Sequence, residues 1–444
     1  MALPPGPARR EPGPAGRFAR LIGCTPDELP AALWGALYFF LLLAGYYILR
    51  PLRDEMGIRG GVEQLQWLFT GTFVVMLAAV PAFGWLSSRV RRVRLVPWVY
   101  AFFALNLLGF LALFHAAGDS PWPARAFFVW TSVYNLFIVS VFWSLMADVC
   151  TRGQAARLFG FVSAGGSAGA IAGPAIAASL AGPLGPVNLL AVSAAFLALE
   201  MLCVDRLVAW RQRRGAPADA GRPIGGGILE ALPLILRSRY LLGLCLFMLL
   251  TTSVATVLYF QQARIVAEAF ADSASRTRVF AAMDLAVNLL AVGTQLFLTG
   301  RIVRRIGLGR ALALVPGLMV AGFLALWAVP VLGMLVIVQV LRRAAHYAVL
   351  RPSREMLFTV VSPAEKYKAK NFIDTVVYRG GDAVSGWFSA GLAAIGLGPG
   401  GVALVAVPLA GAWLFTGLAL GRAQARRLAN EVGRAHDRTR SIHP

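Results

Sequence analysis

The stretch RQRRGAPADAGRPIGGG, from Arg211 to Gly227, divides the chain into two parts that share one pattern. It is polar and rich in glycine, proline and arginine, a composition typical of a linker. Six long apolar runs precede this stretch and six follow it. The pattern therefore predicts two halves of six helices each, joined by a polar segment.

The apolar runs are long enough to cross a lipid bilayer. Of the 444 residues, 58% are hydrophobic and 14% are charged, whereas soluble domains carry about 25% charged residues. A helix of roughly 20 apolar residues spans the hydrocarbon core, and continuous runs do not fit the alternating strands of a membrane β-barrel. We therefore predict an all-α integral membrane protein with twelve transmembrane helices, at residues 30–50, 64–87, 95–115, 124–147, 157–180, 186–208, 239–261, 279–300, 311–329, 332–357, 371–394 and 402–421.

The same pattern sets the expected domain boundaries. Tails are expected at residues 1–29 and 422–444, and the first tail lacks the apolar core of a signal peptide. The two six-helix halves are expected at 30–210 and 236–421, with the linker at 211–235 between them.

Basic residues gather in alternate loops. The chain has 42 lysines and arginines against 21 aspartates and glutamates, a net charge of +21. In a soluble protein this excess would suggest nucleic-acid binding, but cytoplasmic loops of membrane proteins are basic as a rule. We therefore expect a monomeric, multi-pass protein of the inner membrane with both termini cytoplasmic and no nucleic-acid partner. The basic residues that this places on the cytoplasmic side include Arg89, Arg91, Arg92, Arg94, Arg301, Arg304, Arg305, Lys366, Lys368 and Lys370.

Ionisable side chains also occur inside the apolar runs, where they are costly and therefore candidates for function. The tenth run is the richest, and its Arg343, His346 and Tyr347 share one helical face. Arginine suits phosphate and carboxylate groups, although pairing between arginines and acids within the protein is an equally good explanation. The substrate-binding candidates are Arg53, Arg343, His346, Arg354 and Arg379. The gating or coupling candidates are Asp54, Asp148, Asp284, Glu355 and Asp374.

Charged helix ends are candidates for gates. The first run ends with ILRPLRDEM at Met56 and the tenth with the similar VLRPSREM at Met356. Asp148 and Arg354 are candidates for an ion pair across the halves on the cytoplasmic side, which closes the cavity inward and breaks when it opens. A similar role on the opposite side is expected of Arg53, Asp54 and Arg264, with local ion pairs as the alternative.

No pattern of a catalytic or metal centre is present in the sequence. The four cysteines and four histidines fit no zinc, redox or nucleophile motif, so we expect no enzyme activity, metal or cofactor. Gly165, Gly169 and Gly173 lie in a glycine-rich run without the Gly-Lys-Ser/Thr of a phosphate loop. Their four-residue spacing predicts close helix packing instead.

The arrangement of six spans, a polar linker and six more spans resembles the major facilitator architecture. Three segments also resemble the ATP/ADP antiporter family of nucleotide translocases. They are YILRPLRD ending at Asp54, FWSLMAD ending at Asp148, and the region from Tyr347 to Arg379 that contains REM and KNFIDTVVYR.

The resemblance implies a major-facilitator-like fold and exchange of nucleotides. By this resemblance, Arg53 and Arg354 stand where the family has lysines in the first and tenth helices, and Asp148 replaces a glutamate. Charge sign is kept while residue identity changes.

The predicted function is therefore transport of a small anionic solute, such as a nucleotide, by alternating access. One alternative is a proton-coupled major facilitator for another solute, with Asp284 or Glu200 as the proton carrier. The other is a membrane sensor or assembly protein that transports nothing.

Overall fold

The protein is described by a computed structural model. It describes Ala19 and residues 22–89, 92–118, 120–213, 232–362, 365, 369–370 and 372–440. Within these residues no strand occurs, and ten helices are long and apolar enough to cross a membrane. The all-α membrane architecture predicted from the sequence is confirmed. Most of the expected N-terminal tail, most of the linker, Arg91, Lys366 and Lys368 lie outside the described residues.

Each half contains six helical passes in the part of the chain that is described. The first half consists of α2 (Leu29–Arg59), α3 (Leu65–Arg89), α4 (Arg92–Ala116), α5 (Trp122–Val149), α6 (Arg152–Leu180) and α7 (Leu189–Gln212). Four passes of the second half are single helices, namely α9 (Arg239–Ala269), α10 (Ser273–Phe297), α11 (Thr299–Ala328) and α16 (Pro399–Arg440). The other two are composite. One consists of α12 (Leu332–Ala345), η3 (His346–Leu350) and α13 (Arg351–Leu357), and the other of η5 (Ile373–Val377) and α15 (Tyr378–Ala394).

The helices fall on the predicted spans, but α2 and α9 run on beyond the predicted ends at 50 and 261, and α11 begins before the predicted start at 311. The largest difference is at the C-terminus. There, α16 runs on as far as Arg440, through most of the segment expected as a tail. α7 and the η5–α15 pass are not among these ten helices, although they run through the bundle. α7 carries three charged residues, Glu200, Asp205 and Arg206, in its apolar run, while α15 has only 17 residues after the π-helix η5.

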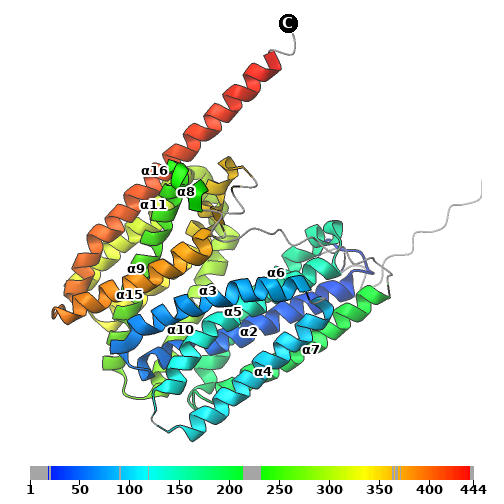
Figure 1. Ribbon diagram of the computed structural model, residues 1–444, viewed down its shortest axis with the longest axis vertical. Coiled ribbons are helices and arrows are strands. Elements are labelled where there is room, and N and C mark those ends of the chain that lie inside the picture. The colour runs from blue at the N-terminus through cyan, green and yellow to red at the C-terminus, as the bar shows by residue number, and fades with distance from the viewer. Residues whose placement is uncertain are drawn as a thin grey trace, which may run out of the picture.

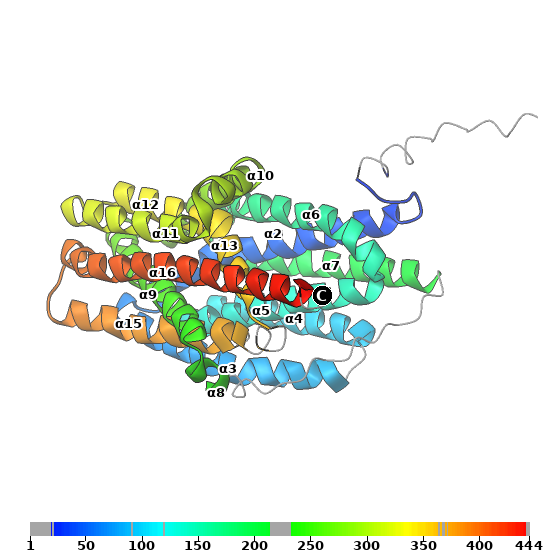
Figure 2. The same cartoon turned by 90° about the horizontal axis from the view of Figure 1, so that it is seen from above.

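Each half has a hydrophobic core of its own. In the first half Tyr38, Phe127 and Phe142 are fully buried, and in the second half Phe323 and Trp413 are nearly so. Figures 1 and 2 show the two groups of long helices, blue to green and green to red, lying beside one another. The helices of the two groups converge at the lower left of Figure 1 and diverge towards the upper right.

The convergent end is closed by apolar contacts between the halves. Ile58 and Phe128 of the first half share a buried cluster with Phe260, Val266 and Phe280 of the second. All of these residues lie near the ends of α2 and α9 or the beginnings of α5 and α10. We call this the closed end, and the end where α2 and α9 begin the open end.

Ion pairs also cross between the halves at the closed end. Arg276 of α10 lies 3.7 Å from Glu55 of α2, and Arg264 of α9 lies 3.7 Å from Glu63. Arg264 therefore pairs with Glu63 of the short helix η1 (Val62–Gln64) rather than with the expected Asp54. Its helix places it nearer to the surface than Asp54, which is buried.

At the open end, α2 is tied to α6 within the first half. The Glu28 carboxylate precedes α2 and accepts hydrogen bonds of 2.5 and 3.4 Å from the Arg157 guanidinium. The Arg157 hydrogen bonds hold the pKa of Glu28 below its usual value. This pair joins two helices of the same half.

α2 and α6 make the closest helix contact in the first half. A side-chain carbon placed on Gly165, Gly169 or Gly173 would overlap the backbone carbonyl of Ala36, Phe40 or Ala44 of α2, respectively. This agrees with the packing role predicted from the glycine spacing, because small residues allow helix backbones to approach closely.

We predict that Gly169→Leu destabilises the first half, because the new side chain overlaps the α2 backbone. Overpacking of this kind costs about 2 kcal/mol or more. The expected result is a lower Tm and loss of the monodisperse peak in size-exclusion chromatography. Gly160→Leu is the matched control, because Gly160 lies on the same helix with no atom within 4 Å of an added carbon. Equal behaviour of the two variants would contradict the packing role.

Candidate functional site

Three adjoining cavities lie between the halves. The main cavity has a volume of about 960 Å³ and is lined by α2, α5 and α6 on one side and by α10, α13 and α15 on the other. A side cavity of about 320 Å³ extends towards α9, and an inner chamber of about 220 Å³ lies nearer to the closed end. Tyr347, Tyr378 and Arg379 line all three, so the cavities form one connected region.

Two π-helical segments shape the wall of this region in the second half. η3 begins at His346 and η5 begins at Ile373, and each interrupts a long helical pass. The wider turn releases backbone carbonyls from their usual partners. Gln295 and Thr299 side chains donate to the carbonyl oxygens of Tyr347 and Ala348 at 3.2 and 2.8 Å. These contacts keep the π-turn in place where His346 and Tyr347 face the cavities.

Arginine dominates the charged lining of the cavities. Seven arginines stand against four carboxylates, namely Arg50, Arg53, Arg342, Arg343, Arg351, Arg354 and Arg379 against Asp54, Glu355, Asp374 and Asp382. The five predicted substrate-binding residues all lie in this lining, as do three of the five gating candidates.

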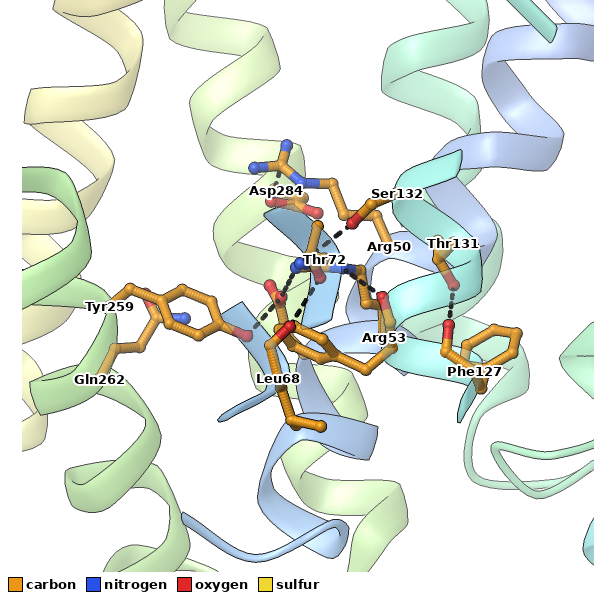
Figure 3. A network of polar contacts seen from close by, with 12 residues as sticks. Arg50, Arg53, Leu68, Thr72, Phe127, Thr131, Ser132, Tyr259, Gln262 and Asp284 are labelled. Atoms are coloured by element: carbon orange, nitrogen blue, oxygen red, sulfur yellow. Dashed lines mark hydrogen bonds and ion pairs between the residues drawn. The ribbon is translucent and has the colours of Figure 1, made fainter. Parts of the chain in front are cut away.

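Asp284 connects the two halves directly behind the lining. It is 1% exposed, and its Oδ1 lies 2.5 Å from Nη2 of Arg343 on α12 and 3.5 Å from Nη1 of Arg50 on α2. Figure 3 shows Asp284 beside Arg50. One buried carboxylate is thus shared by arginines from opposite halves.

Arg53, labelled in Figure 3, and the neighbouring Asp54 follow Arg50 on the next turn of α2, towards the closed end. The Arg53 guanidinium lies 3.8 Å above the Phe128 ring and donates to the Ser132 hydroxyl at 3.4 Å. The Asp54 carboxylate lies 3.3 Å from Arg53 and accepts a hydrogen bond of 3.0 Å from the hydroxyl of Tyr259 in the other half. This hydrogen bond adds a polar contact to the closed end.

Arg354 is paired within its own half. Its guanidinium donates to Asp374 at 3.0 Å and to Glu355 at 3.2 Å, and Glu355 also accepts from Lys370 at 2.6 Å. The predicted pair of Arg354 with Asp148 is not formed in this arrangement of the halves, and it stays a prediction for the state in which the open end is closed. Asp148 ends α5 in the first half, is half-buried, and lines none of the three cavities.

Several lining residues were not among the predicted site residues. One of them is Asp382, which lies 3.7 Å from the predicted Arg379 and accepts from the Thr256 hydroxyl at 3.0 Å. Arg342 donates to Gln339 at 2.9 Å, and neither Arg342 nor Arg351 has a carboxylate within 4.0 Å among the described residues. Asp382, Arg342 and Arg351 could have been found in the sequence as charged residues inside apolar runs. The uncharged Tyr378 and Asn135 do not stand out in the sequence in this way.

The sequence pattern of the Major Facilitator Superfamily matches residues 31–350. No curated protein matches the chain. Among solved structures, a mutant of the nucleoside transporter NupG is 15% identical, with 88% of this chain and 99% of that chain covered at a TM-score of 0.62.

Two other solved structures have the same fold at low identity. A bacterial homologue of the iron transporter ferroportin in its inward-facing state is 12% identical, covering 90% of this chain and 98% of that chain at a TM-score of 0.59. The POT family transporter PepTSo is 12% identical, with 89% of this chain and 97% of that chain covered at a TM-score of 0.62.

The family pattern spans most of the chain, and the fold agrees with it. The protein is accordingly a membrane transporter rather than an enzyme. On these grounds the chain belongs to the Major Facilitator Superfamily.

Proposed function

We propose that this transporter carries a small anionic solute by alternating access, as an exchanger of nucleotides such as ATP and ADP. The observation that carries the proposal is the positive charge left over in the cavities. Most of the arginines have a carboxylate partner, but Arg342 and Arg351 have none among the described residues. Unpaired guanidinium groups at membrane depth are costly, and an anionic ligand with phosphate groups would compensate them.

The arrangement of the halves supports alternating access. The halves meet at the closed end through an apolar cluster and ion pairs, while the main cavity lies between them. In the proposed orientation the protein is a monomer in the inner membrane, both termini are cytoplasmic, and the closed end faces outwards. Rocking of the halves would then break the closed-end contacts and expose the cavity on the other side.

Within this proposal the predicted substrate-binding residues keep their role, and four of the five gating candidates act on the charge of the cavity. Arg53, Arg343, His346, Arg354 and Arg379 contribute to binding the solute. Asp54, Asp284, Glu355 and Asp374 neutralise arginines whenever the solute is absent. Asp148 remains a candidate for the inner gate in the opposite state.

We predict that proteoliposomes take up labelled ATP only when ADP is present inside. Arg351→Gln is expected to weaken the uptake roughly ten- to a hundred-fold, since it removes a charged hydrogen bond to the phosphates. Arg206→Gln is the control, because Arg206 is exposed on α7 and lines none of the cavities. Uptake that is independent of internal ADP would remove the exchange mechanism, and full uptake by Arg351→Gln would remove the proposed site.

Glu200 favours a second candidate function, which is coupling of transport to protons. Its side chain is fully buried in α7, and neither carboxylate oxygen has a hydrogen-bond partner among the described residues. An ionised carboxylate is costly in such surroundings, so this group would hold a proton. The fully buried Tyr38, Tyr100 and Tyr134 belong to the same half.

If transport is coupled to protons at Glu200, an imposed pH gradient will raise uptake by the native protein. Glu200→Gln cannot release a proton, so it will exchange solute but lose the response to the gradient. Glu268→Gln, which changes an exposed carboxylate near the end of α9, will keep the response. Uptake by the native protein that ignores the gradient excludes this second candidate.

A further inference from the structure

The two walls of the main cavity differ in chemistry. The wall from the second half presents Arg351, Arg379 and Glu355. In the wall from the first half, the only charged residues are Arg50 and Arg53, both towards the closed end. The remaining lining residues of this wall are aromatic, aliphatic, hydroxyl-bearing or amide-bearing, for example Phe39, Leu43, Asn135, Val139, Ser140, Trp143, Ser163 and Ser167. Only part of the cavity is therefore suited to an anionic group.

One face of α5 forms the centre of this neutral wall. Asn135, Val139 and Trp143 follow one another at four-residue intervals, so their side chains share a helical face, and all three line the main cavity. The Asn135 amide is half-buried and makes no hydrogen bond to any described residue. An amide offers donors and an acceptor in one plane, so Asn135 is available to a ligand.

Trp143 lies eight residues from Asn135, about 12 Å along the helix towards the open end, and it is held rigidly. Its indole ring makes edge-to-face contacts with Phe39, Phe142 and Phe159, with centroid distances of 5.4, 5.1 and 5.3 Å. It nevertheless remains half-buried and lines the cavity. A fixed aromatic surface suits a planar ring that stacks on it. The free amide two turns away on the same face is available to a polar group of the same solute.

The size of the cavity agrees with a solute larger than an inorganic anion. Ligand pockets for organic molecules have volumes of roughly 300 to 1,000 Å³, and the main cavity has about 960 Å³. A phosphate ion alone would leave the neutral wall without contacts.

We infer that the α5 face of Asn135, Val139 and Trp143 binds a planar nitrogen heterocycle, so that the transported anion is one that carries a nucleobase-like ring. This inference rests on the proposed exchange of nucleotides and assigns the wall of the cavity that binds the ring. The ring lies against the first half, and the anionic group lies against Arg351 and Arg379 of the second half. A single solute would thus contact both halves, as coupled rocking of the halves requires.

The test is equilibrium binding to the purified full-length protein in detergent, with three probes: ATP, inorganic tripolyphosphate and adenosine. ATP is expected to bind more tightly than either of the others. Trp143→Ala and Asn135→Ala are expected to weaken binding of ATP and adenosine by about ten-fold, while tripolyphosphate affinity stays unchanged. Arg351→Gln is expected to show the reverse selectivity, with weaker tripolyphosphate binding and unchanged adenosine binding.

Matched controls separate ring recognition from general damage. Trp98→Ala removes a tryptophan of α4 that is 77% exposed, and Asn106→Ala removes an amide that donates to its own helix at Phe102. Neither residue lines the main cavity, so both variants should bind all probes normally. Asn135→Ala removes no ring contact and serves as the decisive variant if Trp143→Ala does not fold.

Two outcomes contradict the inference in different ways. If ATP and tripolyphosphate bind equally well and Asn135→Ala changes neither affinity, the heterocycle site is overturned while anion binding stands. If none of the three probes binds, both the heterocycle site and the proposed nucleotide transport are overturned.

Discussion

The shared carboxylate of Asp284 is the interaction on which the arrangement of the two halves depends. A buried ionised group in a membrane protein must be compensated, and Asp284 is compensated by Arg343 of its own half and by Arg50 of the other. Separation of the halves would remove one of these partners. An anionic solute that binds Arg50 would also compete with Asp284. Compensation of charge therefore couples occupation of the cavity to the contact between the halves.

The tenth helical pass has a similar set of charged residues nearer to the open end. Arg351 and Arg354 repeat the Arg-Pro-x-Arg spacing of Arg50 and Arg53, and the two stretches line the connected cavities from different halves. The first stretch contributes to the closed end through Asp54. In the second stretch, Arg354 is paired within its own half and is available to a partner from the first half in the opposite state. We interpret the repeat as two related sets of charges that serve the two gates in turn.

The fold could be predicted from the sequence because hydrocarbon thickness fixes the length of each apolar run; the run expected at 239–261, for example, lies within α9. The partners in the ion pairs could not be predicted from the sequence. Arg354 pairs with Asp374 rather than Asp148, because the choice depends on helix rotation and on which end is closed. The spacing of apolar residues in the sequence gives no indication of the π-turn that begins at His346. Uncharged site residues such as Asn135 remained unnoticed, since only charge stands out inside an apolar run.

The central claim is that binding of an anion in the cavity changes the contact between the halves. The most direct measurement is the spin-label distance at both ends of the protein, with and without ATP. One label pair, at Ser120 and Ser275, reports on the closed end, and a second, at Ala156 and Arg304, reports on the open end. Our account predicts that ATP lengthens the closed-end distance and shortens the open-end distance in part of the population. Distances at both ends that do not respond to ATP would contradict it.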